Sequence, residues 1–142
     1  SSSFKAGERI AEMGACINCH FYGAEKPKQD ALTWAPNLVL TKERLRPEWL
    51  VEWFINPQDV MPGTKMPAPY IPTEEPQNSI REVWGSDVAK ISRDSTKLYK
   101  SLIDWMWGME GRKDVSSIVK RHLNSQGYGF IIEEEDDWGD EW

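Results

Sequence analysis

Cysteine and histidine are scarce in this chain, which has two residues of each among 142. A zinc site on Cys16 and Cys19 is disfavoured because it needs two more ligands, and besides His20 the chain offers only His122. A redox dithiol normally lies within alternating strands and helices, and no such alternation is visible. A disulfide across two residues would restrict the unfolded chain little, because the entropic gain grows with loop length. Each of these alternatives is therefore weak.

Long apolar runs are also absent. No stretch reaches the roughly 18 apolar residues that a membrane span requires, so no membrane span is predicted in this chain. The length fits one ordinary domain. Mean hydropathy is −0.61 and 39% of residues are hydrophobic, which is low for a self-sufficient core, yet there are eight Trp, four Tyr and four Phe. Large flat side chains around a large flat ligand would reconcile these two facts.

Positive charge is not concentrated anywhere in the sequence. The formal net charge is −6, but residues 133–142 hold seven acids and no base. Without those seven, the total of 23 acids falls to 16 against 17 bases, so the rest of the chain is nearly neutral. The sequence has no basic patch interleaved with aromatic residues, so binding of nucleic acid is not predicted.

The segment Cys16-Ile17-Asn18-Cys19-His20 carries the strongest signal in the sequence. Two thiols separated by two residues and followed by histidine are typical of a covalent attachment site for a c-type haem. The thiols bond the vinyl groups and the imidazole binds the iron. One such motif predicts one haem c, attached through Cys16 and Cys19, with His20 as an axial ligand.

The motif and the segment Trp34-Ala35-Pro36-Asn37-Leu38 together resemble class I cytochromes c. The resemblance implies an all-α fold of helices and loops wrapped around the haem. It also implies that the carbonyl of Pro36 accepts the ring N–H of His20, which raises the basicity of that ligand. Arg44 matches a family position that faces a haem propionate. Its alternative interpretation is a solvated cation within a charged run.

The resemblance continues without a gap from Leu50 to the segment Pro62-Gly63-Thr64-Lys65-Met66. In the family the methionine of this segment is the second axial ligand, so Met66 is expected to bind the iron through its soft, neutral sulfur. Met61 is the nearest competitor, although a packing role suits it better. Ligation by His122 and an open coordination position are further alternatives.

Four more residues are expected near the haem on the same resemblance. Trp53 stands where the family often has a tyrosine near the ligand sulfur, and its indole can donate a hydrogen bond but cannot accept one. Asn56 and Thr64 match positions that bond the propionate region and the ligand loop. Trp49 could donate to a propionate, or could simply pack.

Hydrophobic spacing predicts five helices. We expect them over residues 4–15, 47–55, 78–90, 95–109 and 114–124. Residues 102–106 of the fourth resemble the terminal helix of class I cytochromes c, and this resemblance implies that the fourth helix crosses the first and brings Trp105 onto Gly7 and Ile10. Gly7 either permits that close approach or sits without a special role in the first turn.

The domain organisation expected is a cytochrome c domain over residues 1–109, with an insertion at about 68–94, followed by an extension over 110–142. The insertion is expected to cover a haem edge or form a partner surface. In the extension, Tyr128–Ile132 is expected to be a short strand or an extended segment. Trp138 and Trp142 could anchor the acidic tail against the body or a neighbouring molecule, and the oligomeric state is open.

The resemblance implies a one-electron carrier that shuttles electrons between redox partner proteins and is not itself an enzyme. An alternative is an electron-entry haem subunit of a larger redox enzyme complex. A gas-binding or peroxidatic haem protein is a third possibility, for which Trp53 is the only distal polar group suggested. Haem attachment to this motif takes place outside the cytoplasm in bacteria, so a periplasmic or cell-surface protein that lost its leader is expected.

Overall fold

The computed structural model describes residues 1–132. The expectations for the acidic tail, Trp138 and Trp142 fall outside these residues. Within them the chain forms helices and turns but no strand, and only two isolated β-bridges occur, His20 with Ala35 and Tyr22 with Glu25. The expected all-α class is confirmed at this level.

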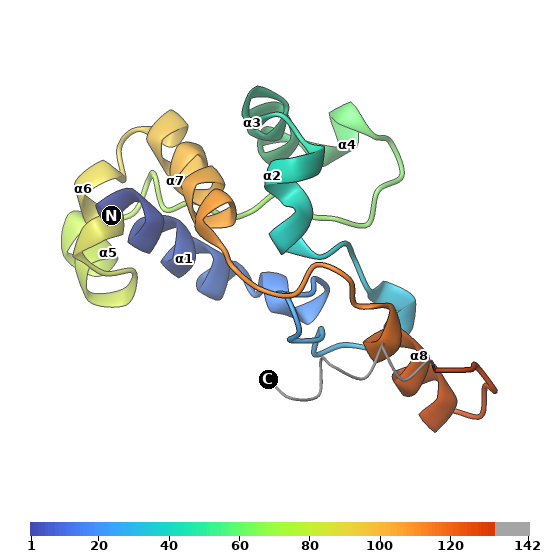
Figure 1. Ribbon diagram of the computed structural model, residues 1–142. Helices are drawn as coiled ribbons and strands as arrows, with labels where there is room; N and C mark the ends of the chain where they lie inside the picture. Colours follow the sequence, from blue (N-terminus) through green and yellow to red (C-terminus); the bar gives the residue numbers. More distant parts are fainter. Residues whose placement is uncertain (133–142) are drawn as a thin grey trace. The chain divides into compact units, whose positions relative to one another are not determined.

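The chain divides into two compact units (Figure 1). We call residues 1–16 and 41–108 the α1/α7 unit, and residues 17–40 with residues 109–132 the His20 unit. Residues 110–132, expected to be part of an extension, therefore belong to the same compact unit as the segment that follows the first cysteine.

Helix α1 (Ser2–Gly14) opens the α1/α7 unit. Ser1 caps it by accepting the Phe4 N–H on its side-chain oxygen at 3.2 Å, which satisfies an end amide that has no partner within the helix. The helix ends at Ala15, whose left-handed backbone (φ 54°) turns the chain toward the cysteines. Its buried face consists of Ala6, Gly7, Ile10 and Ala11.

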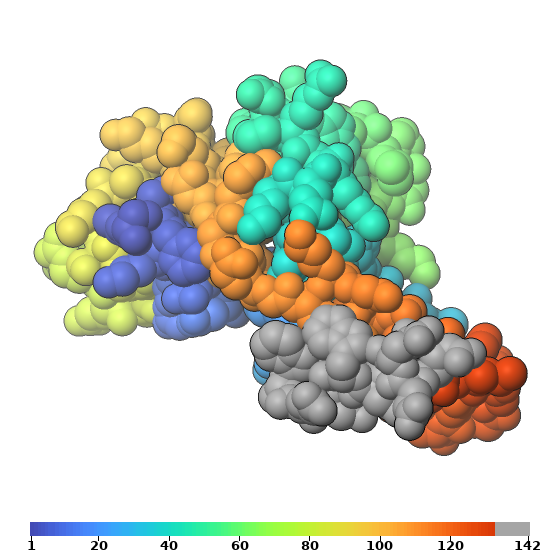
Figure 2. Space-filling view, in the orientation of Figure 1, coloured from blue at the N-terminus to red at the C-terminus, as the bar shows by residue number. Residues whose placement is uncertain are grey.

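Helix α7 (Ser95–Gly108) packs along α1 (Figure 1). The backbones approach so closely that a Cβ at Gly7 would lie 1.9 Å from the Ser101 carbonyl oxygen and 2.9 Å from Trp105 Cβ. The expected meeting of Trp105 and Gly7 is thus confirmed, and Gly7 is there because no larger residue fits. Figure 2 shows α1 in blue at the surface, between α7 in orange and the insertion in yellow and yellow-green.

The insertion forms two helices, α5 (Gln77–Val83) and α6 (Ser86–Ile91), which corrects the expectation of one helix over 78–90. The break falls at Gly85, whose φ of 92° is disfavoured for residues with side chains. Trp84 beside it is 5% exposed. Helix α6 contacts both α1 and α7, so the insertion contributes to the core of this unit.

Three shorter helices complete the unit: α2 (Thr41–Arg44), α3 (Pro47–Ile55) and α4 (Pro57–Val60). Helices α2 and α3 contact α7, and α4 contacts α3. The bounds of α3 are those expected, because proline is favoured in the first turn and Asn56-Pro57 ends the helix. Neither α2 nor α4 was expected from the sequence.

The His20 unit contains 3₁₀ turns at Ala31–Thr33 and Leu38–Leu40 and one longer helix, α8 (Ser116–Ser125). Helix α8 ends in a Schellman motif, in which the N–H groups of Gly127 and Tyr128 donate to the carbonyls of Asn124 and Leu123. The segment after it has no regular secondary structure up to residue 132, so the expected short strand does not form there.

No helix within residues 1–132 has both the length and the apolar composition needed to cross a membrane.

Candidate functional site

The two cysteines follow directly on α1, as the sequence predicts. Ala15 terminates the helix, and a 3₁₀ turn over Cys16–Asn18 leads to Cys19. No disulfide joins the cysteines. Both are half-buried, and the Cys19 sulfur lies 3.7 Å from the side-chain oxygen of Gln29. The two thiols are thus not bonded to each other and lie just after the end of α1.

His20 makes the hydrogen bond that the sequence predicts. Its Nδ1 lies 2.7 Å from the carbonyl oxygen of Pro36, and the β-bridge to Ala35 aligns the two segments. A carbonyl can only accept, so Nδ1 carries the proton and Nε2 keeps a lone pair. Burial lowers the pKa of His20, partly offset by this hydrogen bond. The neutral ring, which is the form that binds a metal, is thereby favoured.

Asn37 supports this arrangement, a role that the sequence did not reveal. Its side-chain oxygen accepts from the Gly23 N–H at 3.0 Å and the Val39 N–H at 3.2 Å. Its amide nitrogen donates to the carbonyls of Arg112 at 2.9 Å and Lys113 at 3.3 Å. The Pro-Asn-Leu motif contains this residue, but its partner segment lies 75 positions away.

In the α1/α7 unit, Met66 is held by Trp53. The indole Nε1 of Trp53 donates to the Met66 sulfur at 3.0 Å, and the ring of Trp53 stacks on that of Trp49 with 5.2 Å between centroids. Met66 is half-buried, whereas the side chain of Met61 is 56% exposed. The sulfur has two lone pairs, so one can accept from Trp53 while the other binds a metal.

A turn at residues 61–64 presents Met66. The Thr64 N–H donates to the Met61 carbonyl at 3.1 Å, with proline second and Gly63 (φ 90°) third, the pattern of a type II turn. Gln58 closes this loop, a second role that the sequence did not reveal: its side chain accepts from the Gly63 N–H at 3.0 Å and donates to the Thr64 carbonyl. Thr64 Oγ1 accepts from the Met66 N–H at 3.3 Å.

The remaining predicted residues have local roles. Asn56 caps α4 by accepting from the Gln58 N–H at 3.2 Å, which also anchors the start of the ligand loop. Arg44 is exposed at the end of α2. Contacts of Arg44, Trp49, Asn56 and Thr64 with a haem remain predictions.

The predicted residues thus fall into two local groups. The His20 unit brings His20 and Pro36 together, with Cys19 adjacent in the chain. The α1/α7 unit brings together Trp49, Trp53, Thr64 and Met66, and it includes Cys16.

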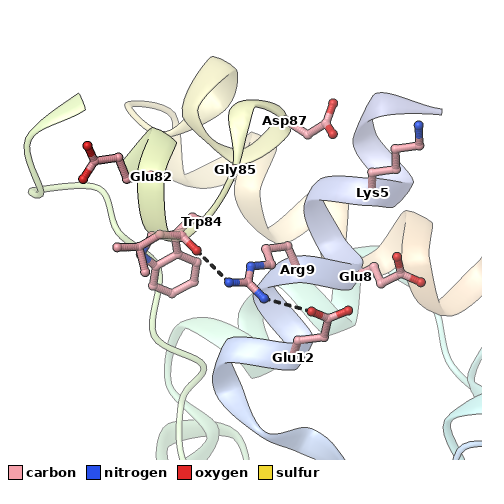
Figure 3. Close-up of a pocket in the computed structure, with 9 residues that line it drawn as sticks. Lys5, Glu8, Arg9, Glu12, Glu82, Trp84, Gly85 and Asp87 are labelled. Atoms are coloured by element: carbon pink, nitrogen blue, oxygen red, sulfur yellow. Dashed lines mark hydrogen bonds and ion pairs between the residues drawn. The ribbon is translucent and has the colours of Figure 1, made fainter. Parts of the chain in front are cut away.

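A cleft of the α1/α7 unit lies away from these residues. It has a volume of about 420 Å³ and is bordered by α1 on one side and by α5 and α6 on the other (Figure 3). The guanidinium of Arg9 spans it, donating to the Val83 carbonyl at 2.7 Å and to Glu12 at 3.0 Å. None of the predicted site residues lines this cleft.

The predicted site residues include the donor types that a c-type haem would require. Within residues 1–132, no group of three or more His, Cys, Asp and Glu side chains is arranged to hold a metal. A haem iron instead receives four nitrogen ligands from the ring and needs only axial ligands from the protein. An imidazole with a lone pair on Nε2, a thioether and two thiols supply what that group requires.

Comparison of the chain with models of known protein families, with curated proteins and with solved structures found no match.

Proposed function

We propose that this protein transfers single electrons through one haem c, attached through Cys16 and Cys19 and bound axially by His20 Nε2 and Met66 Sδ. In this proposal the fold is that of a class I cytochrome c, and the crossing of α1 and α7 at Gly7 supports it. When bound, the haem supplies an iron that alternates between Fe(II) and Fe(III).

The observation that carries the proposal is the hydrogen bond from His20 Nδ1 to Pro36, at 2.7 Å. Histidines that bind metals usually donate the other ring N–H to a carbonyl or carboxylate, which sets the tautomer and ring orientation. Here that geometry occurs at the one histidine that follows two cysteines in the attachment pattern.

The chain's own residues hold the site and tune it. Pro36 orients His20 and increases its electron donation, which favours the oxidised state. The N–H of Trp53 withdraws electron density from the Met66 sulfur, which favours the reduced state. With two protein ligands no coordination position remains open, so the proposed activity is electron transfer and not chemistry on a bound substrate.

The proposal extends to location and partners. Attachment of the haem outside the cytoplasm implies a periplasmic or cell-surface protein. Its partners are redox proteins that dock transiently, because a carrier must release each partner after one electron.

Visible spectroscopy of the oxidised holoprotein tests the ligand set. Methionine-ligated ferric haem c has a weak long-wavelength band, which we expect in the wild type. Met66→Ala should abolish it, and Met61→Ala is the matched control that should retain it because that side chain is largely exposed. If the band disappeared in Met61→Ala but not in Met66→Ala, Met61 and not Met66 would be the ligand. A high-spin wild type that rapidly binds carbon monoxide when reduced would refute the proposed carrier function.

A further inference from the structure

We propose that Asn37 is a positioning residue through which the chain segment 111–113 orients the proximal ligand His20. This inference rests on the proposed function. It assigns the C-terminal part of the chain a role within the site, namely support of the carbonyl that accepts the His20 ring proton.

Asn37 has the connections this role requires. It is 5% exposed, and its side chain makes the four hydrogen bonds described above, two accepted and two donated. An asparagine amide has two donor hydrogens and two acceptor lone pairs, so its capacity is fully used. Rotation of the amide would leave these buried polar groups without partners, which is energetically unfavourable.

The link from Asn37 to His20 is a single peptide group. The carbonyl oxygen of Pro36 and the nitrogen of Asn37 belong to the same planar unit, so the orientation of one sets that of the other. Fixing Asn37 to Gly23, Val39 and the 111–113 segment therefore fixes the direction in which the Pro36 carbonyl points.

The 111–113 segment cannot shift freely, because its backbone crosses that of Gly23 without intervening side chains. A Cβ at Gly23 would lie 3.2 Å from the Arg112 nitrogen, and a Cβ at Gly111 would lie 3.3 Å from Gly23 Cα. Both glycines have positive φ, 61° and 150°. The two backbones thus meet in one register that larger residues would disturb.

The rest of the C-terminal part holds this segment in place. Arg112 is 4% exposed and donates through Nη2 to Ser117 on α8 at 2.8 Å. Farther along α8, the ring of His122 lies 4.7 Å from that of Trp34, which itself packs edge-on against Phe21. Helix α8 therefore contacts Trp34, which precedes Pro36, directly, and it is linked to Asn37, which follows Pro36, through Arg112.

The functional consequence concerns the strength of the His20 hydrogen bond. A firmly held acceptor draws the Nδ1 proton toward it, which makes the ring a better donor to iron and stabilises the ferric state. Loosening Asn37 should weaken that bond and raise the midpoint potential.

The test compares Asn37→Ala with Asn124→Ala in the full-length holoprotein. Asn124 is a matched control: it lies in the same unit and its amide makes two hydrogen bonds to the Phe130 backbone, outside the Pro36 segment. Midpoint potential and NMR exchange of the Gly23 amide and the His20 ring N–H are measured. We expect roughly tenfold faster exchange of both protons in Asn37→Ala, equivalent to about 1.4 kcal/mol, and a higher potential. Asn124→Ala should change neither.

Two results would overturn the inference. One is an Asn37→Ala holoprotein with wild-type exchange and potential, and the other is an equal change in both variants. If Asn37→Ala yields no holoprotein, Gly111→Ala perturbs the same crossing and should shift both readouts in the same direction. Native-state exchange of the wild type gives an independent check, because the Gly23 and Val39 amides must be protected as strongly as those of α8. A wild type without covalent haem would instead refute the proposed function. The exchange rates of the Gly23 and Val39 amides would still show whether the hydrogen bonds of Asn37 form.

Discussion

Replacing Trp53 with phenylalanine removes the N–H that lies 3.0 Å from the Met66 sulfur and leaves an aromatic ring beside Trp49. The hydrogen bond draws electron density from the sulfur and so weakens its support of Fe(III). The variant should therefore have a lower midpoint potential than the wild type.

The size of the shift follows from the strength of the bond. A typical hydrogen bond contributes about 0.5–1.5 kcal/mol, and a thioether is a weak acceptor, so the lower part of that range applies. About 1.4 kcal/mol corresponds to a tenfold change, or roughly 59 mV for one electron. If most of the bond energy discriminates between the oxidation states, the potential should fall by about 20–45 mV.

Spectroelectrochemical titration of the holoprotein measures this shift, with Trp84→Phe as the control. Trp84 lies in the insertion, where its ring packs against that of Tyr70, so its replacement should leave the potential nearly unchanged. A rise in potential for Trp53→Phe would refute the reasoning. Equal shifts in both variants would also refute it, because they would show that packing and not the N–H sets the potential.

Two further predictions concern stability. Gly7→Ala should destabilise the protein by about 3 kcal/mol or more, since the new Cβ would lie 1.9 Å from the Ser101 carbonyl oxygen. Denaturant unfolding measures the free energy of unfolding of each variant. The control Gly129→Ala should change it by no more than about 0.5 kcal/mol, because a Cβ there would have no neighbouring atom within 4 Å. Equal losses of stability in the two variants would contradict the close approach of α1 and α7. Asp114 accepts the Ser116 N–H at 2.9 Å, and hydrogen bonds from Ser116 lower the pKa of its carboxyl. Asp114→Ala should therefore lower the free energy of unfolding by about 0.5–1 kcal/mol at neutral pH. This difference should shrink as pH falls below 3.8, through the lowered pKa, and a difference independent of pH would count against this hydrogen bond.

Local sequence signals predicted the longer helices because their causes are local. Helix α3 begins at Pro47 and ends before Asn56-Pro57, so both of its limits are visible in the sequence. The insertion was predicted less well: apolar spacing continues across residue 85, but the positive φ of Gly85 separates α5 from α6. Periodicity reports which residues are buried and does not report where the backbone turns.

The same distinction between local and long-range causes applies to the candidate site. Cys16, Cys19, His20 and Met66 could be proposed as site residues because each falls in a short sequence pattern. Asn37 could not be assigned a role, since its function depends on Arg112, 75 residues later, and a side-chain amide can bond any backbone segment that the fold brings to it.

The geometry of the loop that presents Met66 could not be predicted from the sequence either. Gln58 resembles any exposed polar residue, yet its side chain joins Gly63 to Thr64 in the loop that presents Met66. The one local signal in this loop is Pro62-Gly63, a pair that is typical of the middle of a type II turn.

The mass of the mature protein, produced in bacteria that attach c-type haem in the periplasm, tests the central claim most directly. The account predicts the chain mass plus one haem that survives denaturation, with loss of covalent haem when Cys16 and Cys19 are both replaced by alanine. A wild-type chain that carries no covalent haem under these conditions would contradict it.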